Sequence, residues 1–184
     1  MNFWPDYQIA EEAEDEAAAA AVAKGMAKVS VGTFLVALGG LIILPLFHNQ
    51  FFSGPLINAV LLIITMMLGL RAGVILSFVP SIMALLAGLL PALLMPFLPF
   101  IMAGNILLVV IFHYLRQKNY WLGAGLGAIV KFAFLTAAIQ IFFRFFINKP
   151  VVQAIAYMMS WNQLYSALLG AVIAFAFLKF IKRI

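Results

Sequence analysis

The sequence predicts an all-α integral membrane protein, a bundle of six transmembrane helices with both termini in the cytoplasm. Of its 184 residues, 66% are hydrophobic and only 9% are charged, whereas a soluble domain has roughly 45–50% apolar and about 25% charged residues. Apolar runs approach the length of about 20 residues that a helix needs to cross a bilayer, and they recur along most of the chain. Lys and Arg are spread singly between these runs, which is typical of residues that set membrane topology.

A transmembrane domain, residues 29–184, is expected to contain all six spans. They cover residues 29–47, 56–70, 73–90, 99–115, 122–146 and 158–181. The second and third follow each other so closely that they predict a tight hairpin. Pro80 should kink the third unless neighbouring groups satisfy the freed carbonyl, because proline lacks the N–H that a helix interior uses. The proline-rich, uncharged residues 89–100 then cap one face of the membrane.

A polar head, residues 1–28, precedes the first span. It is rich in strong helix formers, with acids first and lysines last, the order that a helix dipole favours. We expect it to be helical and cytoplasmic, either as a solvated helix or as a docking element for another subunit.

The distribution of basic residues sets the orientation. Eight of them fall on one side of the six spans, namely Lys24, Lys28, Arg71, Arg116, Lys118, Lys179, Lys182 and Arg183. The other side has only Arg144 and Lys149. Because Lys and Arg accumulate in cytoplasmic loops, both termini are predicted to lie in the cytoplasm.

The acidic residues exclude several functions. All six carboxylates of the chain lie within residues 6–16, so neither ion coupling through intramembrane acids nor carboxylate acid–base catalysis has a residue to use. The chain has no cysteine, its two histidines (His48 and His113) are expected at opposite faces, and it has no GxxxxGK[ST] phosphate loop. We therefore predict no enzyme activity, no metal, no cofactor and no nucleic-acid partner, and expect any energy input to come from other subunits.

Few polar residues lie within the spans. They are Asn58, Asn105, Lys131, Gln140, Trp161, Asn162, Gln163 and Tyr165. All except Lys131 fall toward the outer half of the membrane. They either line an outward-opening pocket, in which a few polar groups orient a small molecule, or serve as interhelical hydrogen bonds and aromatic anchors.

Lys131 lies near the middle of the fifth span, in the sequence GAIVKFAFL. A lysine at the bilayer centre costs about 2.5–3.5 kcal/mol, so it should face the bundle. Gly123, Gly127 and Lys131 share one helix face, and small residues let a neighbouring helix approach closely. Asn105 or carbonyls freed by prolines are expected to accept its protons. Lys131 is then either a structural cross-brace or a direct ligand for an anionic or carbonyl group of a substrate.

Four segments carry a family resemblance. They are LPLFH closing the first span, LPFIMAGNILLVVIF in the fourth, GAIVKFAFL in the fifth and SWNQLYSALLGAVIAFAFLK in the last. In order and spacing, over roughly residues 30–182, the chain resembles the substrate-binding S components of energy-coupling factor (ECF) transporters, the vitamin and micronutrient importers of prokaryotes.

The resemblance implies a high-affinity, S-component-like binding subunit for a vitamin-like solute in a prokaryotic plasma membrane. A separate transmembrane coupling subunit and two ATP-binding cassette subunits would energise it. Together with the argument for Lys131, the candidate substrate contacts are Asn105, Lys131, Gln140, Trp161, Asn162 and Gln163. The implied gate loop contains His48, Asn49, Gln50, Phe51 and Phe52, and the coupling subunit would dock on Thr33, Ala37 and Gly40. The alternative is a non-transporting accessory or scaffold subunit of a larger membrane complex, with residues 1–28 as its docking element.

Overall fold

The computed structural model describes residues 30–47, 49–88, 92–146 and 150–182. These residues form helices and no strand, so the all-α prediction is confirmed for this part of the chain. The chain divides into two compact units, residues 1–36 and 37–184. In the first unit, residues 30–36 are helical, and the predicted polar head lies outside the described residues.

The second unit is a succession of helices joined by short connections. It begins with helix over residues 37–43 and continues with η1 (Leu44–Phe47), α2 (Gln50–Leu68), α3 (Leu70–Leu76), α4 (Val79–Leu86), η2 (Ala92–Phe97), α5 (Leu98–Leu115), α6 (Tyr120–Phe146) and α7 (Pro150–Phe180).

Five helical segments of the described chain are long and apolar enough to cross a membrane. They are Ser30–Phe47, Phe51–Leu68, Met95–Leu115, Tyr120–Ile141 and Trp161–Phe180. These segments indicate a multi-pass membrane protein. The segment Leu70–Leu86 is also apolar and helical but shorter.

The predicted third span, residues 73–90, is not one continuous helix. α3 ends at Leu76 and α4 begins at Val79, with Pro80 in its first turn. Ser77 closes α3, because both its backbone N–H (3.0 Å) and its Oγ (2.8 Å) donate to the carbonyl of Gly73. The kink expected at Pro80 takes the form of a short interruption at Ser77 and Phe78, which keep right-handed helical backbone angles within the segment Leu70–Leu86.

α2 begins earlier than predicted. Asn49 is its N-cap, since its Oδ1 accepts a hydrogen bond from the backbone N–H of Phe51 at 3.1 Å. The helix then continues through Gly54 and Pro55, which suggested a connection in the sequence. The placement of residues 50–52 in a loop was therefore wrong, because the cap starts the helix before the proline is reached.

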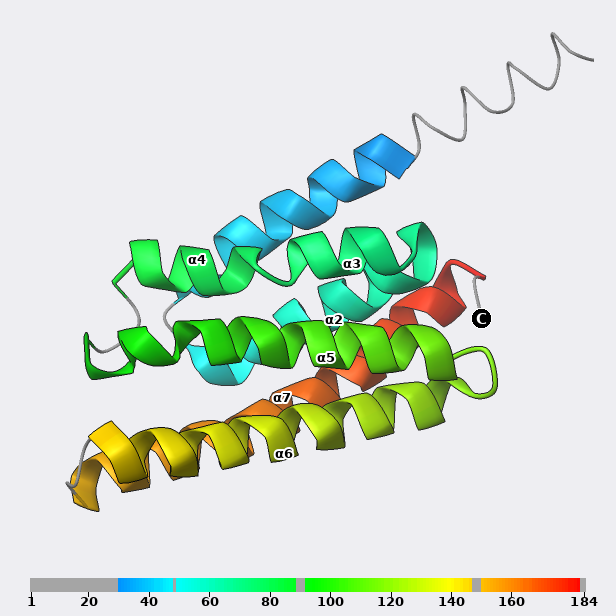
Figure 1. Ribbon diagram of the computed structural model, residues 1–184. Coiled ribbons are helices and arrows are strands. Elements are labelled where there is room, and N and C mark those ends of the chain that lie inside the picture. Colours follow the sequence, from blue (N-terminus) through cyan, green and yellow to red (C-terminus); the bar gives the residue numbers. More distant parts are fainter. Residues whose placement is uncertain (1–29, 48, 89–91, 147–149, 183–184) are drawn as a thin grey trace, which may run out of the picture. The chain divides into compact units, whose positions relative to one another are not determined.

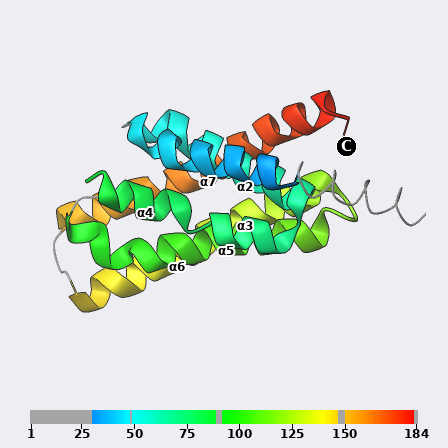
Figure 2. The same cartoon turned by 90° about the horizontal axis from the view of Figure 1, so that it is seen from above.

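Neighbouring helices of the second unit form a closed ring. α2 packs against α7 and α3, α3 packs against α5, α5 against α6, and α6 against α7. Figures 1 and 2 both show α5 and α6 running side by side. The residues that face inward from this ring therefore have protein on all sides.

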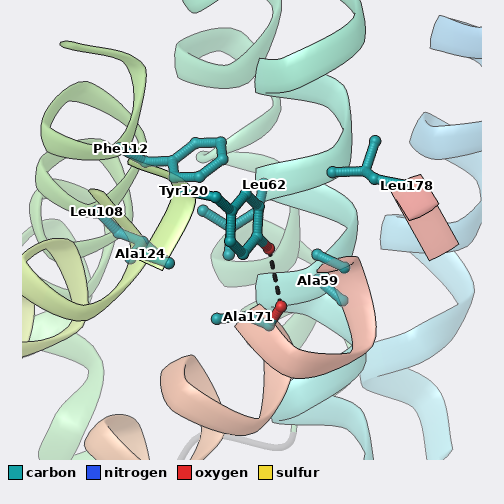
Figure 3. Close-up of a cluster of buried hydrophobic side chains, with 9 residues drawn as sticks. Ala59, Leu62, Leu108, Phe112, Tyr120, Ala124, Ala171 and Leu178 are labelled. Carbon is teal, nitrogen blue, oxygen red and sulfur yellow. Dashed lines mark hydrogen bonds between the residues drawn. The ribbon is translucent and has the colours of Figure 1, made fainter. Parts of the chain in front are cut away.

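One end of the ring is closed by buried apolar residues around Tyr120, here called the Tyr120 cluster. Its members are Ala59, Leu62, Leu108, Phe112, Tyr120, Ala124, Ala171, Ala174 and Leu178. The Tyr120 hydroxyl donates to the carbonyl of Ala171 at 2.8 Å, as Figure 3 shows. The cluster brings together the carboxyl-terminal parts of α2, α5 and α7 with the start of α6.

Candidate functional site

The side chain of Lys131 lies inside the ring of helices and is 1% exposed. Its Nζ donates to Oδ1 of Asn58 on α2 at 2.9 Å and to Oδ1 of Asn105 on α5 at 2.8 Å. Two predictions are confirmed, that Lys131 faces the bundle and that Asn105 accepts one of its protons.

Close packing of α5 against α6 directs Lys131 inward. A Cβ atom on Gly123 would lie 2.9 Å from the backbone nitrogen of Arg116, and one on Gly127 would lie 3.0 Å from the carbonyl oxygen of Leu108. Only glycine lets the two backbones approach so closely. Lys131 follows Gly127 by one turn on the same face, so it points at α5 as the glycine seam predicted.

The two asparagines are themselves held in place. Nδ2 of Asn58 donates to the carbonyl of Gly54 (2.9 Å) and to Oγ of Ser166 (3.2 Å). Nδ2 of Asn105 donates to the carbonyl of Ser77 (3.3 Å) at the break between α3 and α4. Because each amide nitrogen has its own acceptor, each amide oxygen is left to face the cation.

We call Asn58, Ser77, Asn105, Lys131 and Ser166 the Lys131 network. All five residues are buried, and they join α2, α5, α6, α7 and the α3–α4 break. Ser166 continues the chain of hydrogen bonds, since its Oγ donates to the carbonyl of Gln163 at 3.0 Å.

The electrostatics of the network are unusual because its cation has only neutral partners. A hydrogen bond to a charged group contributes about 1.5–3 kcal/mol, so two such bonds roughly offset the 2.5–3.5 kcal/mol cost of a central lysine. An ammonium carries three N–H donors, and within the described residues only the two asparagine oxygens accept from it. One donor is therefore available to an additional acceptor.

The other predicted substrate contacts are distributed differently. Gln140 is exposed and lies outside the network. Trp161 is 50% exposed, with its ring 5.0 Å from that of Phe132. Asn162 and Gln163 are half-buried, and Gln163 reaches the network through its backbone carbonyl. A role of these residues in binding a substrate stays a prediction.

The predicted gate and docking residues have the following environments. His48 lies outside the described residues, and of Gln50 only the helical backbone is described. Asn49 is the exposed cap of α2. Phe51 and Phe52 are 66% and 71% exposed. Of the predicted docking residues, Thr33 and Gly40 are half-buried and Ala37 is buried. The gating and docking roles stay predictions.

Sequence reasoning missed three members of the network. Asn58 was noted as a polar residue within a span but not as a partner of Lys131, which is 73 positions away. Ser166 and Ser77 were not singled out. Serine is common in membrane helices, so the only available signal was that both lie in long apolar runs.

The described part of the chain has no group of three or more His, Cys, Asp or Glu residues that could hold a metal ion. In comparisons with known proteins, no protein-family model, curated protein or solved structure matches this chain.

Proposed function

We propose that this protein is the membrane-embedded, solute-binding subunit of an ECF-type transporter, with a small vitamin-like molecule as its solute. The observation that carries the proposal is the Lys131 network, a polar centre inside an otherwise apolar ring of helices. A solute with a carbonyl or anionic group can accept the third N–H of the Lys131 ammonium. The apolar and aromatic side chains nearby would hold the rest of the molecule.

The proposed topology has six crossings, with the interrupted segment Leu70–Leu86 as the third span and both termini in the cytoplasm of a prokaryotic cell. Broken helices are tolerated at membrane depth where protein surrounds them. The Tyr120 cluster supports this crossing: it brings the carboxyl-terminal half of α2 (Leu62) together with that of α5 (Phe112), so the chain between them must return across the bundle.

The basic residues also support six crossings. With six spans they divide eight to two, as counted above. If Leu70–Leu86 did not cross, each side would have five: Lys24, Lys28, Arg71, Arg144 and Lys149 against Arg116, Lys118, Lys179, Lys182 and Arg183. A five-span protein would thus lack the charge bias that orients membrane proteins.

In this proposal the subunit depends on partners for energy. Its carboxylates are confined to residues 6–16 and it has no phosphate-binding loop, so a separate coupling subunit and two ATP-binding cassette subunits drive the transport cycle. The chain itself is not an enzyme and needs no cofactor.

Native mass spectrometry of the protein released from its own membranes tests this function. We expect a bound small molecule in wild type and its loss in K131M, while K131M stays monodisperse with unchanged helix content. The matched control is Y120F, which removes a buried hydrogen bond in the Tyr120 cluster and should retain the solute. Solute-free wild type under all conditions, or full retention by K131M, would contradict the proposal.

One observation favours the alternative of an accessory or scaffold subunit. Lys131 is almost completely buried and its two amide partners offset most of its cost, which suits a cross-brace without a ligand. Co-purification with subunits other than an ATPase module, lost on deleting residues 1–28, would support this function instead.

A further inference from the structure

A group of cations lies at the end of the second unit that the Tyr120 cluster closes. Arg71 is in the first turn of α3, Arg116 directly follows α5, and Lys118 is in the connection to α6. Lys179 is in the last turn of α7 and Lys182 follows it. All except the half-buried Arg116 are exposed. We call these five residues the basic end.

The basic end has no counter-charge among the described residues. The chain has no Asp or Glu after residue 16, so no acidic side chain of the second unit can pair with these cations. Their mutual repulsion favours an anion that binds from outside the unit.

Arg116 is held in a fixed position within this group. Its Nη1 donates to the carbonyl of Met66 at 3.0 Å and contacts the Met66 sulfur at 2.7 Å, which fastens the start of the α5–α6 connection to the end of α2. Its Nε is buried and has no hydrogen-bond partner among the described residues. Burial also lowers the pKa of Arg116 from its ordinary value, the direction expected when a cation loses water without gaining an anion.

His113 lies one turn before Arg116 on α5. Its Nδ1 is likewise buried and unpartnered within the described part of the chain. Residues three apart on a helix are neighbours on its surface, so two unused polar atoms, one on a guanidinium and one on an imidazole, lie on the same side of α5.

Two exposed aromatic residues lie at this end of α5 and α6, and the ring of one, Tyr114, is 5.4 Å from that of His113. Tyr114 is 65% exposed and Trp121 is 47% exposed. Such residues are enriched where membrane helices meet the headgroup layer. We therefore place the basic end at headgroup depth, where lipid phosphates are present at high local concentration.

We propose that the basic end, together with His113, is a binding site for the phosphate of an anionic phospholipid, with Arg116 and His113 as inner contacts and Arg71 and Lys118 as outer contacts. The planar guanidinium of Arg116 presents N–H donors whose spacing matches the oxygen atoms of a phosphate. The exposed cations add long-range attraction to an anionic headgroup, an effect found where basic side chains lie at an anionic membrane surface.

Lipid titrations followed by native mass spectrometry test this site. Wild type is titrated with phosphatidylglycerol and, separately, with phosphatidylcholine of the same acyl chains. The variants are R71Q, K118Q and the double variant R71Q/K118Q, all at exposed positions away from the fold's interior. The control is R144Q, which removes a cation near the opposite end of α6.

Phosphatidylglycerol should bind wild type more tightly than phosphatidylcholine does. R71Q and K118Q should each weaken phosphatidylglycerol binding about fivefold, which corresponds to the free energy that one basic residue contributes near an anionic surface. The double variant should weaken it roughly 25-fold. R144Q should bind like wild type, and millimolar inorganic phosphate should not displace the lipid. Equal binding of the two lipids, an equal loss in R144Q, or displacement by free phosphate would overturn the proposal.

Discussion

Lys131 and Asn105 should be energetically coupled, so the effect of removing Lys131 should depend on whether Asn105 is present. We compare K131M, N105L and the double variant K131M/N105L. K131M removes the cation and leaves two amide oxygens, whereas N105L removes one acceptor and leaves the cation buried with Asn58 alone.

The expected magnitudes follow from the two hydrogen bonds. K131M loses both, at about 1.5–3 kcal/mol each, but regains the 2.5–3.5 kcal/mol cost of the central charge. Its net destabilisation is therefore roughly 0–3 kcal/mol. N105L loses the bond to Lys131, about 1.5–3 kcal/mol, and also the bond from its amide nitrogen to the Ser77 carbonyl, about 0.5–1.5 kcal/mol, with no such gain. When N105L is already present, adding K131M removes only the bond to Asn58 and still relieves the full cost of the buried charge, about 2.5–3.5 kcal/mol. In that background K131M should therefore leave the stability unchanged or increase it.

The free energy of unfolding is measured by titration with sodium dodecyl sulfate in mixed micelles, with tryptophan fluorescence as the signal. Trp161 is a suitable probe because its ring contacts Phe132, the residue next to Lys131. The coupling energy between K131M and N105L should be about 1.5–3 kcal/mol. The control pair K131M/Y120F should be additive, because the two residues are about 16 Å apart along α6 at 1.5 Å per residue. Additivity of K131M and N105L within about 0.5 kcal/mol would refute the reasoning.

Two further predictions concern other contacts of the second unit. G170A should destabilise the protein, because a Cβ on Gly170 would lie 2.7 Å from the carbonyl oxygen of Pro55. G125A should be neutral or stabilise the protein by up to about 1 kcal/mol, because nothing lies within 4 Å of a Cβ on Gly125. Thermal unfolding in detergent measures both variants, and equal effects would contradict the close approach of α7 to α2 at Gly170. Y120F should cost about 1 kcal/mol through the lost hydrogen bond to Ala171, measured in the same way; an unchanged midpoint would show that this bond adds nothing.

Much of the fold was predictable because membrane helices are defined by long apolar runs. Four of the six predicted spans correspond closely to apolar helical segments of the structure. The errors fall at proline residues. Pro55 lies inside a helix capped by Asn49 and does not interrupt it, whereas Pro80 lies in the first turn of α4, directly after the interruption that separates α4 from α3.

The candidate site was predictable only in part. The burial of Lys131 followed from the cost of its charge and from the register of Gly123 and Gly127. Asn105 followed as an available acceptor. The pairing with Asn58 and the support from Ser166 depend on how α2 and α7 pack, and no local pattern in a single sequence specifies such long-range contacts.

The chain order of the Lys131 network has a consequence for biosynthesis. Both acceptors, Asn58 and Asn105, precede Lys131 in the sequence, so both have already left the ribosome when the lysine reaches the insertion machinery. The charged helix can thus find its partners while it enters the bilayer. Ser166 is the last residue of the network to be synthesised, and its hydroxyl accepts the hydrogen bond that orients Asn58. The network is therefore complete only once α7 has inserted.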